Sequence, residues 1–203
     1  MGIARPSITF FGATTGRKTL TNILRSLYGQ FDHGNDRIEL FFDGPTFTEV
    51  GPDYFQPEQE LYGEDLIIHL LPVNLGCWGH SIRNKYQGTF HTDYISNFDD
   101  DDVYAENCML QVRQDIKENF GKLLMYKFRN CDGIQWREPV IKHGNVGTPT
   151  GLIPNDPSIL GTWGEFAGGD AYFYETTRDK IGNNNIVWKD FLIYKTRPHV
   201  YGP

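Results

Sequence analysis

Apolar residues follow a helical period in only two stretches of this chain, residues 16–29 and 102–121. Within each stretch they recur three and four positions apart, which places them on one face of a helix. Gly29 and Gly121 stand where the two patterns end, as glycine commonly does after the last turn of a helix. The patterns therefore predict two main helices, Lys18–Tyr28 and a second within Asp102–Gly121. The residues of the two stripes are Leu20, Ile23, Leu24, Leu27 and Tyr28, and Ala105, Cys108, Met109, Val112, Ile116 and Phe120.

Elsewhere the chain consists of short β-branched or aromatic runs separated by glycine and proline, a pattern typical of strands and turns. Because repeated alternation of strand and helix is missing from this pattern, we expect an α+β protein with an antiparallel β scaffold, two main α-helices and long Gly/Pro loops. No regular element is predicted between residues 130 and 169. The predicted strands are 7–11, 37–42, 46–50, 65–71, 86–90, 122–128, 170–176 and 185–195.

Length and composition indicate one soluble domain, 1–203, in which 1–30 form an N-terminal strand and helix and 196–203 a tail that packs on a neighbouring molecule. The net charge is −7 and no long basic cluster exists, which argues against nucleic acid or an anionic membrane as a partner. No apolar run is long enough to insert into a membrane, and no signal peptide is recognised. Cys77, Cys108 and Cys131 are too few for a disulfide framework, although a bridge between two copies stays open.

One local pattern is suggestive of phosphate binding. A predicted strand leads into Gly12, and Lys18 and Thr19 follow at the offsets of a phosphate-binding loop before a helix. Arg17, however, occupies the position where that loop needs a glycine. Nucleotide binding by Gly12, Lys18 and Thr19 is therefore an alternative hypothesis, and a plain helix entry is the favoured one.

Other candidate chemistry is weak. The run Asp99–Asp102 offers carboxylates to a hard cation, but it lacks the glycine and glutamate of a calcium loop, so we interpret it as the N-terminal cap of the second helix. The six histidines have no zinc-ligand spacing, and no serine lies in a nucleophile motif. The sequence thus predicts no catalytic residue, metal or cofactor, and a protein that is not an enzyme.

The abundance of rings suggests association between copies instead, because the chain has 11 Tyr, 14 Phe and 4 Trp. Tyr and Lys both titrate near pH 10 when unperturbed, so an assembly held by them should dissolve in alkali. Phe120 and Met109 are assigned to the core. The predicted contacts between copies are Tyr54, Tyr62, Tyr86, Tyr201, Cys77 and Cys131.

The order of several segments resembles the polyhedrin/granulin family, the matrix proteins of insect-virus occlusion bodies, in a divergent, nudivirus-type form. The segment 114–126, which passes from a helix into a strand, is the most similar piece. The resemblance implies a jelly-roll-like antiparallel β-sandwich and homotrimers packed in a crystal lattice. The segments that carry it are 5–8, 18–28, 66–74, 93–95, 114–126, 189–195 and 200–203.

The predicted function is therefore a self-assembling viral structural protein that forms the crystalline matrix of occlusion bodies, protects virions and dissolves at alkaline pH. Its expected partners are copies of itself and the virion envelope, and its expected location is an occlusion body in the nucleus of the infected cell. A phage neck or tail component and the nucleotide-binding enzyme described above are the alternatives.

Overall fold

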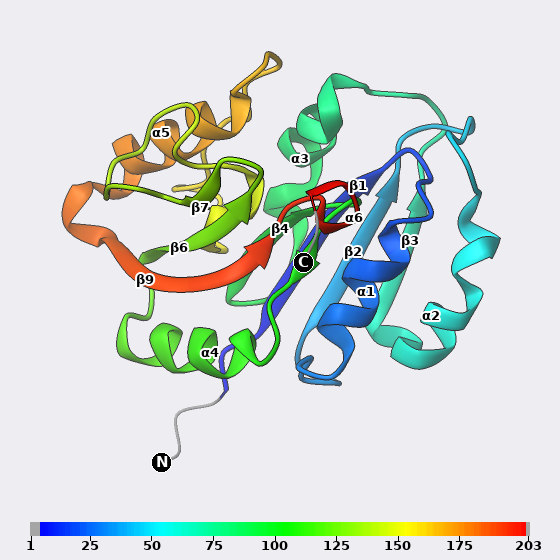
Figure 1. Cartoon of the computed structure of the whole chain (residues 1–203), viewed down its shortest axis with the longest axis horizontal. Coiled ribbons are helices and arrows are strands. Elements are labelled where there is room, and N and C mark those ends of the chain that lie inside the picture. Colours follow the sequence, from blue (N-terminus) through cyan, green and yellow to red (C-terminus); the bar gives the residue numbers. More distant parts are fainter. Residues whose placement is uncertain (1–4, 202–203) are drawn as a thin grey trace.

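The computed structural model describes residues 5–201, apart from the side chains of His199 and Tyr201, and shows a mixed β-sheet with helices on both faces (Figure 1). Within the described residues, nine strands lie in the order β3-β2-β1-β4-β8-β6-β9-β5, with β7 paired to β6. The strands are β1 (Ile8–Thr14), β2 (Arg37–Phe42), β3 (Leu66–Leu70), β4 (Tyr94–Asp99), β5 (Val103–Tyr104), β6 (Leu123–Asn130), β7 (Gly133–Gln135), β8 (Gly151–Pro154) and β9 (Ile186–Lys195).

The N-terminal half alternates strand and helix, which corrects the prediction of an antiparallel β-sandwich. Strands β3, β2, β1 and β4 run parallel, and only the later strands introduce antiparallel pairs. Parallel neighbours need a crossover between them, and here the crossovers are helical. The class is therefore α/β. The helices are α1 (Leu20–Tyr28), α2 (Gln56–Tyr62), α3 (His80–Tyr86), α4 (Cys108–Glu118), α5 (Gly169–Ile181) and α6 (Pro198–Tyr201).

Two apolar layers, one on each face of the sheet, explain why the strands lack a polar face. Phe10 packs in the layer that α1, α2 and α4 complete, whereas its neighbour Phe11 packs in the layer completed by α3 and α5. Phe42 and Phe41 are divided in the same way. Successive side chains of a strand point to opposite faces, so a strand covered on both sides is apolar at nearly every position.

Several predicted elements are confirmed and others are wrong. The strand 37–42 and the two main helices are present, although the second helix begins only at Cys108. Segment 46–50 is not a strand, 86–90 closes α3 and continues into a 3-10 turn, and 170–176 lies within helix α5. The 130–169 span contains β7 and β8. Met109 is in the core as predicted, but Phe120 is 64% exposed because the chain has already left α4 there.

Burial of the tyrosines overturns the physical basis of the alkaline-dissolution prediction. Burial raises the pKa of Tyr94 to about 12, and it raises the pKa values of other core tyrosines above their ordinary value as well. These rings therefore do not supply negative charge near pH 10. The other tyrosines with a raised pKa are Tyr62, Tyr104, Tyr126, Tyr174 and Tyr194.

The same burial predicts how stability depends on pH. Since the pKa of Tyr94 is higher in the folded chain, the folded state keeps its proton after the unfolded state has lost it. The free energy of unfolding should be fully maintained below about pH 10 and should fall as the pH rises from there toward about 12. Urea denaturation at stepped pH measures this loss. Tyr94→Phe should flatten the slope, whereas an unchanged slope in that variant would assign the loss to other groups.

Candidate functional site

The candidate site lies where the strand order reverses. From β1 the chain proceeds through β2 to β3 on one side, and it returns to β4 on the other side of β1. At such a point the loops after the two central strands separate and leave a crevice at their carboxyl ends. Here those ends are Thr14 of β1 and Asp99 of β4.

Two adjoining pockets occupy this edge of the sheet. The first, which we call the strand-end pocket, has a volume of about 310 Å³ and takes Thr14 from the end of β1 and Asp43 and Trp78 from the loops after β2 and β3. The second, the helix-end pocket, has a volume of about 330 Å³ and includes Asp170 at the start of α5 and the nearby His143. The two pockets are adjacent and have four lining residues in common, namely Asp99, Asp101, Thr148 and Arg197.

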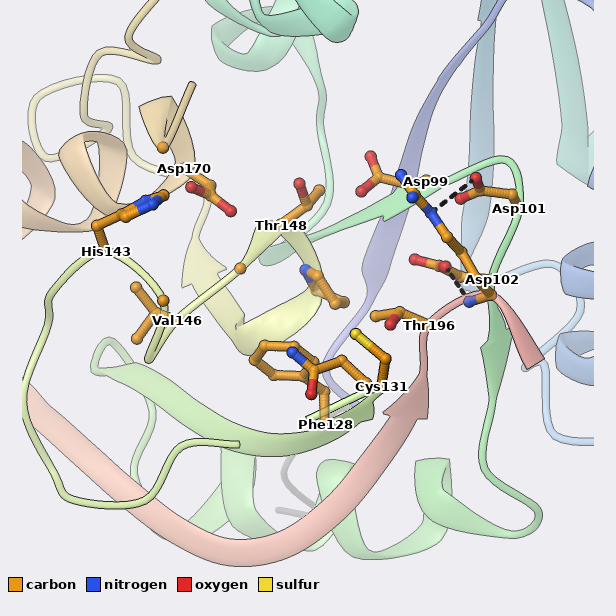
Figure 2. A pocket seen from close by; sticks show the side chains of 16 residues that line it. Asp99, Asp101, Asp102, Phe128, Cys131, His143, Val146, Thr148, Asp170 and Thr196 are labelled. Atoms are coloured by element: carbon orange, nitrogen blue, oxygen red, sulfur yellow. Dashed lines mark hydrogen bonds and ion pairs between the residues drawn. The ribbon is translucent and has the colours of Figure 1, made fainter. Parts of the chain in front are cut away.

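Figure 2 shows how the helix-end pocket is divided. Asp170 and His143 lie on one side, the carboxylates that follow β4 lie on the other, and Thr148 lies between them. A ligand long enough to cross from one side to the other would therefore contact acidic groups at both of its ends.

Arginines hold the acidic run Asp99–Asp102 in place. Arg83, which is almost fully buried, donates from Nη2 to the Asp99 carboxylate at 2.8 Å and to the Phe98 carbonyl at 2.9 Å. Arg17 Nη1 lies 2.8 Å from Asp101 Oδ2, and Arg197 Nε lies 3.2 Å from the same oxygen. The run thus extends from the last residue of β4 to the start of β5 and does not cap α4, which corrects the sequence interpretation.

Two of the four carboxylates, Asp100 and Asp102, are buried and each lines one pocket, whereas Asp99 and Asp101 line both. Thr14 donates its hydroxyl to Asp100 at 2.5 Å, and the Arg197 backbone N–H donates to Asp102 at 2.8 Å. Burial raises the pKa of Asp100 to about 6 and raises that of Asp102 above its ordinary value. Asp99, whose side chain is 39% exposed, and Asp101 border both pockets and are available to a ligand.

Asp170 occupies the first turn of α5, and two glycines allow its surroundings to approach closely. At Gly168, whose φ is +89°, a Cβ would lie 2.3 Å from His143 Nδ1. At Gly169 a Cβ would lie 1.9 Å from the Gly164 carbonyl oxygen. Asp170 Oδ1 accepts the Ala171 N–H at 2.8 Å, and burial raises the pKa of this carboxyl. A half-buried carboxylate of this kind is suited to accept a proton.

The loop before α5 is fixed against α3, which positions Asp170. His80 donates from Nδ1 to the Gly164 carbonyl at 2.6 Å, and burial lowers the pKa of this histidine. Arg83 stacks over the Trp163 ring at 4.9 Å, and that ring stacks on Phe173 of α5 with centroids 4.3 Å apart. Arg83 therefore connects Asp99, which lines both pockets, with helix α5, which carries Asp170.

The loop after β1, in which a phosphate site was considered, does reach the strand-end pocket, but through residues other than those predicted. Gly12 lies inside β1, where a Cβ would be 2.2 Å from the Phe98 ring, and the Lys18 N–H donates to Glu49 at 3.0 Å. Thr19 directly precedes α1. None of these three lines the strand-end pocket, which takes Ala13, Thr14, Thr15 and Arg17 from the same loop.

The residues predicted to contact other copies are scattered. Tyr54 is exposed, Tyr86 stacks on Phe41 with centroids 4.5 Å apart, and Tyr62 is a core residue whose hydroxyl donates to the Leu24 carbonyl at 2.6 Å. The side chain of Tyr201, like residues 202–203 of the predicted tail, lies outside the described residues. Contacts between copies stay a prediction. Both Cys77, which is half-buried, and Cys131, which is exposed in the helix-end pocket, are free thiols.

Over residues 5–201 no group of three or more His, Cys, Asp or Glu side chains is arranged to hold a metal ion by itself. In the same part of the chain no helix is long and apolar enough to cross a membrane.

Solved structures with this fold include S. aureus TarS chains. TarS 1–349 matches with a TM-score of 0.73 and 18% identity over 94% of this chain, and TarS 1–349 in complex with UDP-GlcNAc matches with 0.72 and 18% over 94%. TarS 1–349 in complex with UDP gives 0.70 and 16% over 94%. This chain spans 60%, 58% and 60% of those chains, respectively. No family model and no curated protein matches the chain.

These neighbours correct the remaining predictions. The likeness to the polyhedrin/granulin family is wrong, because residues 5–201 form a mixed sheet with the fold of TarS and not a jelly-roll sandwich. The predicted occlusion-body matrix and its location are wrong with it, since the neighbours are bacterial proteins that were crystallised with UDP and UDP-GlcNAc. The prediction that the chain is not an enzyme is contradicted by these neighbours, which include TarS in complex with UDP and with UDP-GlcNAc.

Proposed function

We propose that this chain is the nucleotide-sugar-binding part of a glycosyltransferase and that its donor is a UDP-sugar. The observation that carries the proposal is the pair of adjoining pockets at the carboxyl ends of β1 and β4, with Asp99 and Asp101 lining both and Asp170 at the far side. The complexes of TarS with UDP and UDP-GlcNAc support this choice of donor.

The acidic side chains fit a divalent cation. Asp99 and Asp101 repel a diphosphate, and the arginines beside them are already paired with these carboxylates, so a further positive charge between the carboxylates and the diphosphate favours its binding there. Mg²⁺ is commonly held by one or two protein carboxylates together with substrate phosphates, which agrees with a site that has no complete ligand set of its own. When bound, such an ion neutralises the charge that develops on the departing diphosphate. Asp99 and Asp101 would hold it.

Asp170 supplies the chemistry at the other side. Its carboxylate accepts the proton of an acceptor hydroxyl as the oxygen of that hydroxyl forms a bond to the anomeric carbon of the sugar. The bond from that carbon to the diphosphate breaks, UDP leaves with its electron pair, and the proton remains on Asp170. Burial favours this role because it raises the pKa of Asp170 toward the range in which a general base is efficient.

Titration calorimetry with UDP tests the proposal directly. We expect saturable UDP binding in the presence of MgCl₂ or MnCl₂ and a large loss of affinity in EDTA, whereas uridine should bind weakly under both conditions because it lacks the diphosphate. A second arm measures UDP release from UDP-GlcNAc. Equal UDP affinity with and without the cation would contradict the assigned role of the two carboxylates, and the absence of any UDP binding would overturn the function.

A further inference from the structure

Four consecutive residues after β3 have a left-handed backbone. The φ angles of Gly76, Cys77, Trp78 and Gly79 are 68°, 54°, 52° and 79°. Glycine adopts such angles freely, but a bulky side chain does so at an energetic cost. Trp78 and Cys77 therefore adopt a conformation that only their surroundings can maintain.

Contacts at both ends of the segment 76–79 maintain its left-handed backbone. The Asp43 carboxylate accepts the N–H groups of Leu75 at 2.6 Å and Gly76 at 2.9 Å, and Asn74 Nδ2 donates to the Asp43 carbonyl at 3.1 Å. At the other end, a Cβ at Gly79 would lie 2.6 Å from the Cβ of Ala13 in β1. The turn is thus attached to the carboxyl ends of β2 and β1, which are the ends that form the strand-end pocket.

The Trp78 side chain, which this strained turn carries, buries little of its surface on folding. Trp78 is 71% exposed, the largest exposure of any aromatic side chain among the described residues. Its ring lies 6.3 Å from the ring of His80, and it lines the strand-end pocket. Strain that exposes a large ring, and does not bury it, favours ligand binding over packing as the role of Trp78.

We propose that the Trp78 indole stacks on the nucleobase of the bound nucleoside diphosphate. The inference rests on the proposed function. If the diphosphate lies at Asp99 and Asp101 and the sugar lies toward Asp170, the nucleoside is left with the opposite end of the strand-end pocket, where Asp43 and Trp78 are. No other residue lining that pocket presents an exposed aromatic ring, and stacking on an indole contributes substantially to the binding of a base.

The test compares ligands with and without a base. Trp78→Gly removes the ring and also suits the left-handed backbone, so the thermal midpoint should not fall. In titration calorimetry with MnCl₂ we expect this variant to bind UDP about tenfold or more weakly than the wild type. Its affinity for inorganic pyrophosphate should equal that of the wild type, because pyrophosphate has no base to stack.

Two further variants complete the experiment. In the wild type we expect UDP to quench tryptophan fluorescence, and Trp78→Phe should lose this quenching while retaining most of the UDP affinity. Tyr54→Ala removes an exposed ring that does not line the pocket and should change neither affinity. Undiminished UDP affinity in Trp78→Gly, or an equal loss for UDP and pyrophosphate, would overturn the stacking role. A wild-type chain that binds neither ligand would overturn the proposed function itself.

Discussion

Replacing Asp170 with asparagine is expected to reduce the rate of UDP release from UDP-GlcNAc by about 10²- to 10⁴-fold and to leave the affinity for UDP nearly unchanged. The amide cannot accept the proton of the acceptor hydroxyl, so the step that deprotonates the nucleophile loses its base. The side-chain oxygen that accepts the Ala171 N–H is retained, which keeps the first turn of α5 in place. Because Asp170 borders the helix-end pocket and not the strand-end pocket, UDP keeps its own contacts.

The matched control lies on the same helix. Asp179 is exposed and pairs with Arg178, so Asp179→Asn makes the same chemical change in α5 without reaching a pocket. Its turnover should equal that of the wild type. The wild-type rate should also rise with pH as Asp170 loses its proton, and this rise should disappear in Asp170→Asn. A variant that retains its turnover, or that loses UDP affinity in parallel, would remove Asp170 from the role of base.

The sequence allows some elements of this fold to be predicted but not their arrangement. The run Arg37–Phe42 was recognisable as a strand because its side chains are β-branched, aromatic or long, yet burial on both faces removed the alternation that would have shown how it pairs. Helices α2 and α3 have seven residues each, too few to display a clear stripe. Without these two crossovers the alternating order of a parallel sheet could not be seen.

Helix α5 illustrates a different difficulty. In the sequence, Ala171 and Phe173 alternate with Tyr172 and Tyr174 as in a strand. In the structure Phe173 and Tyr174 are both buried and Tyr172 is exposed, which is the pattern of a helix. Gly168 and Gly169 at its start resemble a loop in the sequence, although they are needed for close contacts with His143 and Gly164. Asp170, the carboxylate that this helix contributes to the candidate site, was consequently assigned to a strand.

The candidate site could have been found in part from the sequence. The run Asp99–Asp102 follows a buried segment, Tyr94–Phe98, and carboxylates at the carboxyl end of a buried strand are a signal for a ligand-binding edge. Nothing local indicates that Asp170, about 70 positions further on, lies across the same pocket. That proximity depends on the long-range contacts of Trp163 with Arg83 and Phe173, and these emerge only when the chain is folded.

Asp101→Asn is expected to lower the affinity for UDP in the presence of MnCl₂ by about 100-fold or more, because Asp101 is one of the two carboxylates proposed to hold the cation. In EDTA this loss of UDP affinity should disappear or become a gain. Without a cation, Asp101 only repels the diphosphate, and its replacement by a neutral amide releases Arg17 and Arg197 from their ion pairs with it. The variant should therefore bind UDP in EDTA as well as the wild type does, or better.

A loss of UDP affinity in MnCl₂ but not in EDTA distinguishes a carboxylate that binds the cation from one with a merely structural role. If Asp101 served only to anchor Arg17 and Arg197, its loss would weaken UDP binding by the same factor with MnCl₂ and with EDTA. Asp190→Asn is the control, since Asp190 is exposed on β9, pairs with Lys127 and lines neither pocket. Its titration curves should overlay those of the wild type under both conditions. Equal losses in Asp101→Asn under the two conditions would place the cation elsewhere and leave the arginines as the groups that bind the diphosphate.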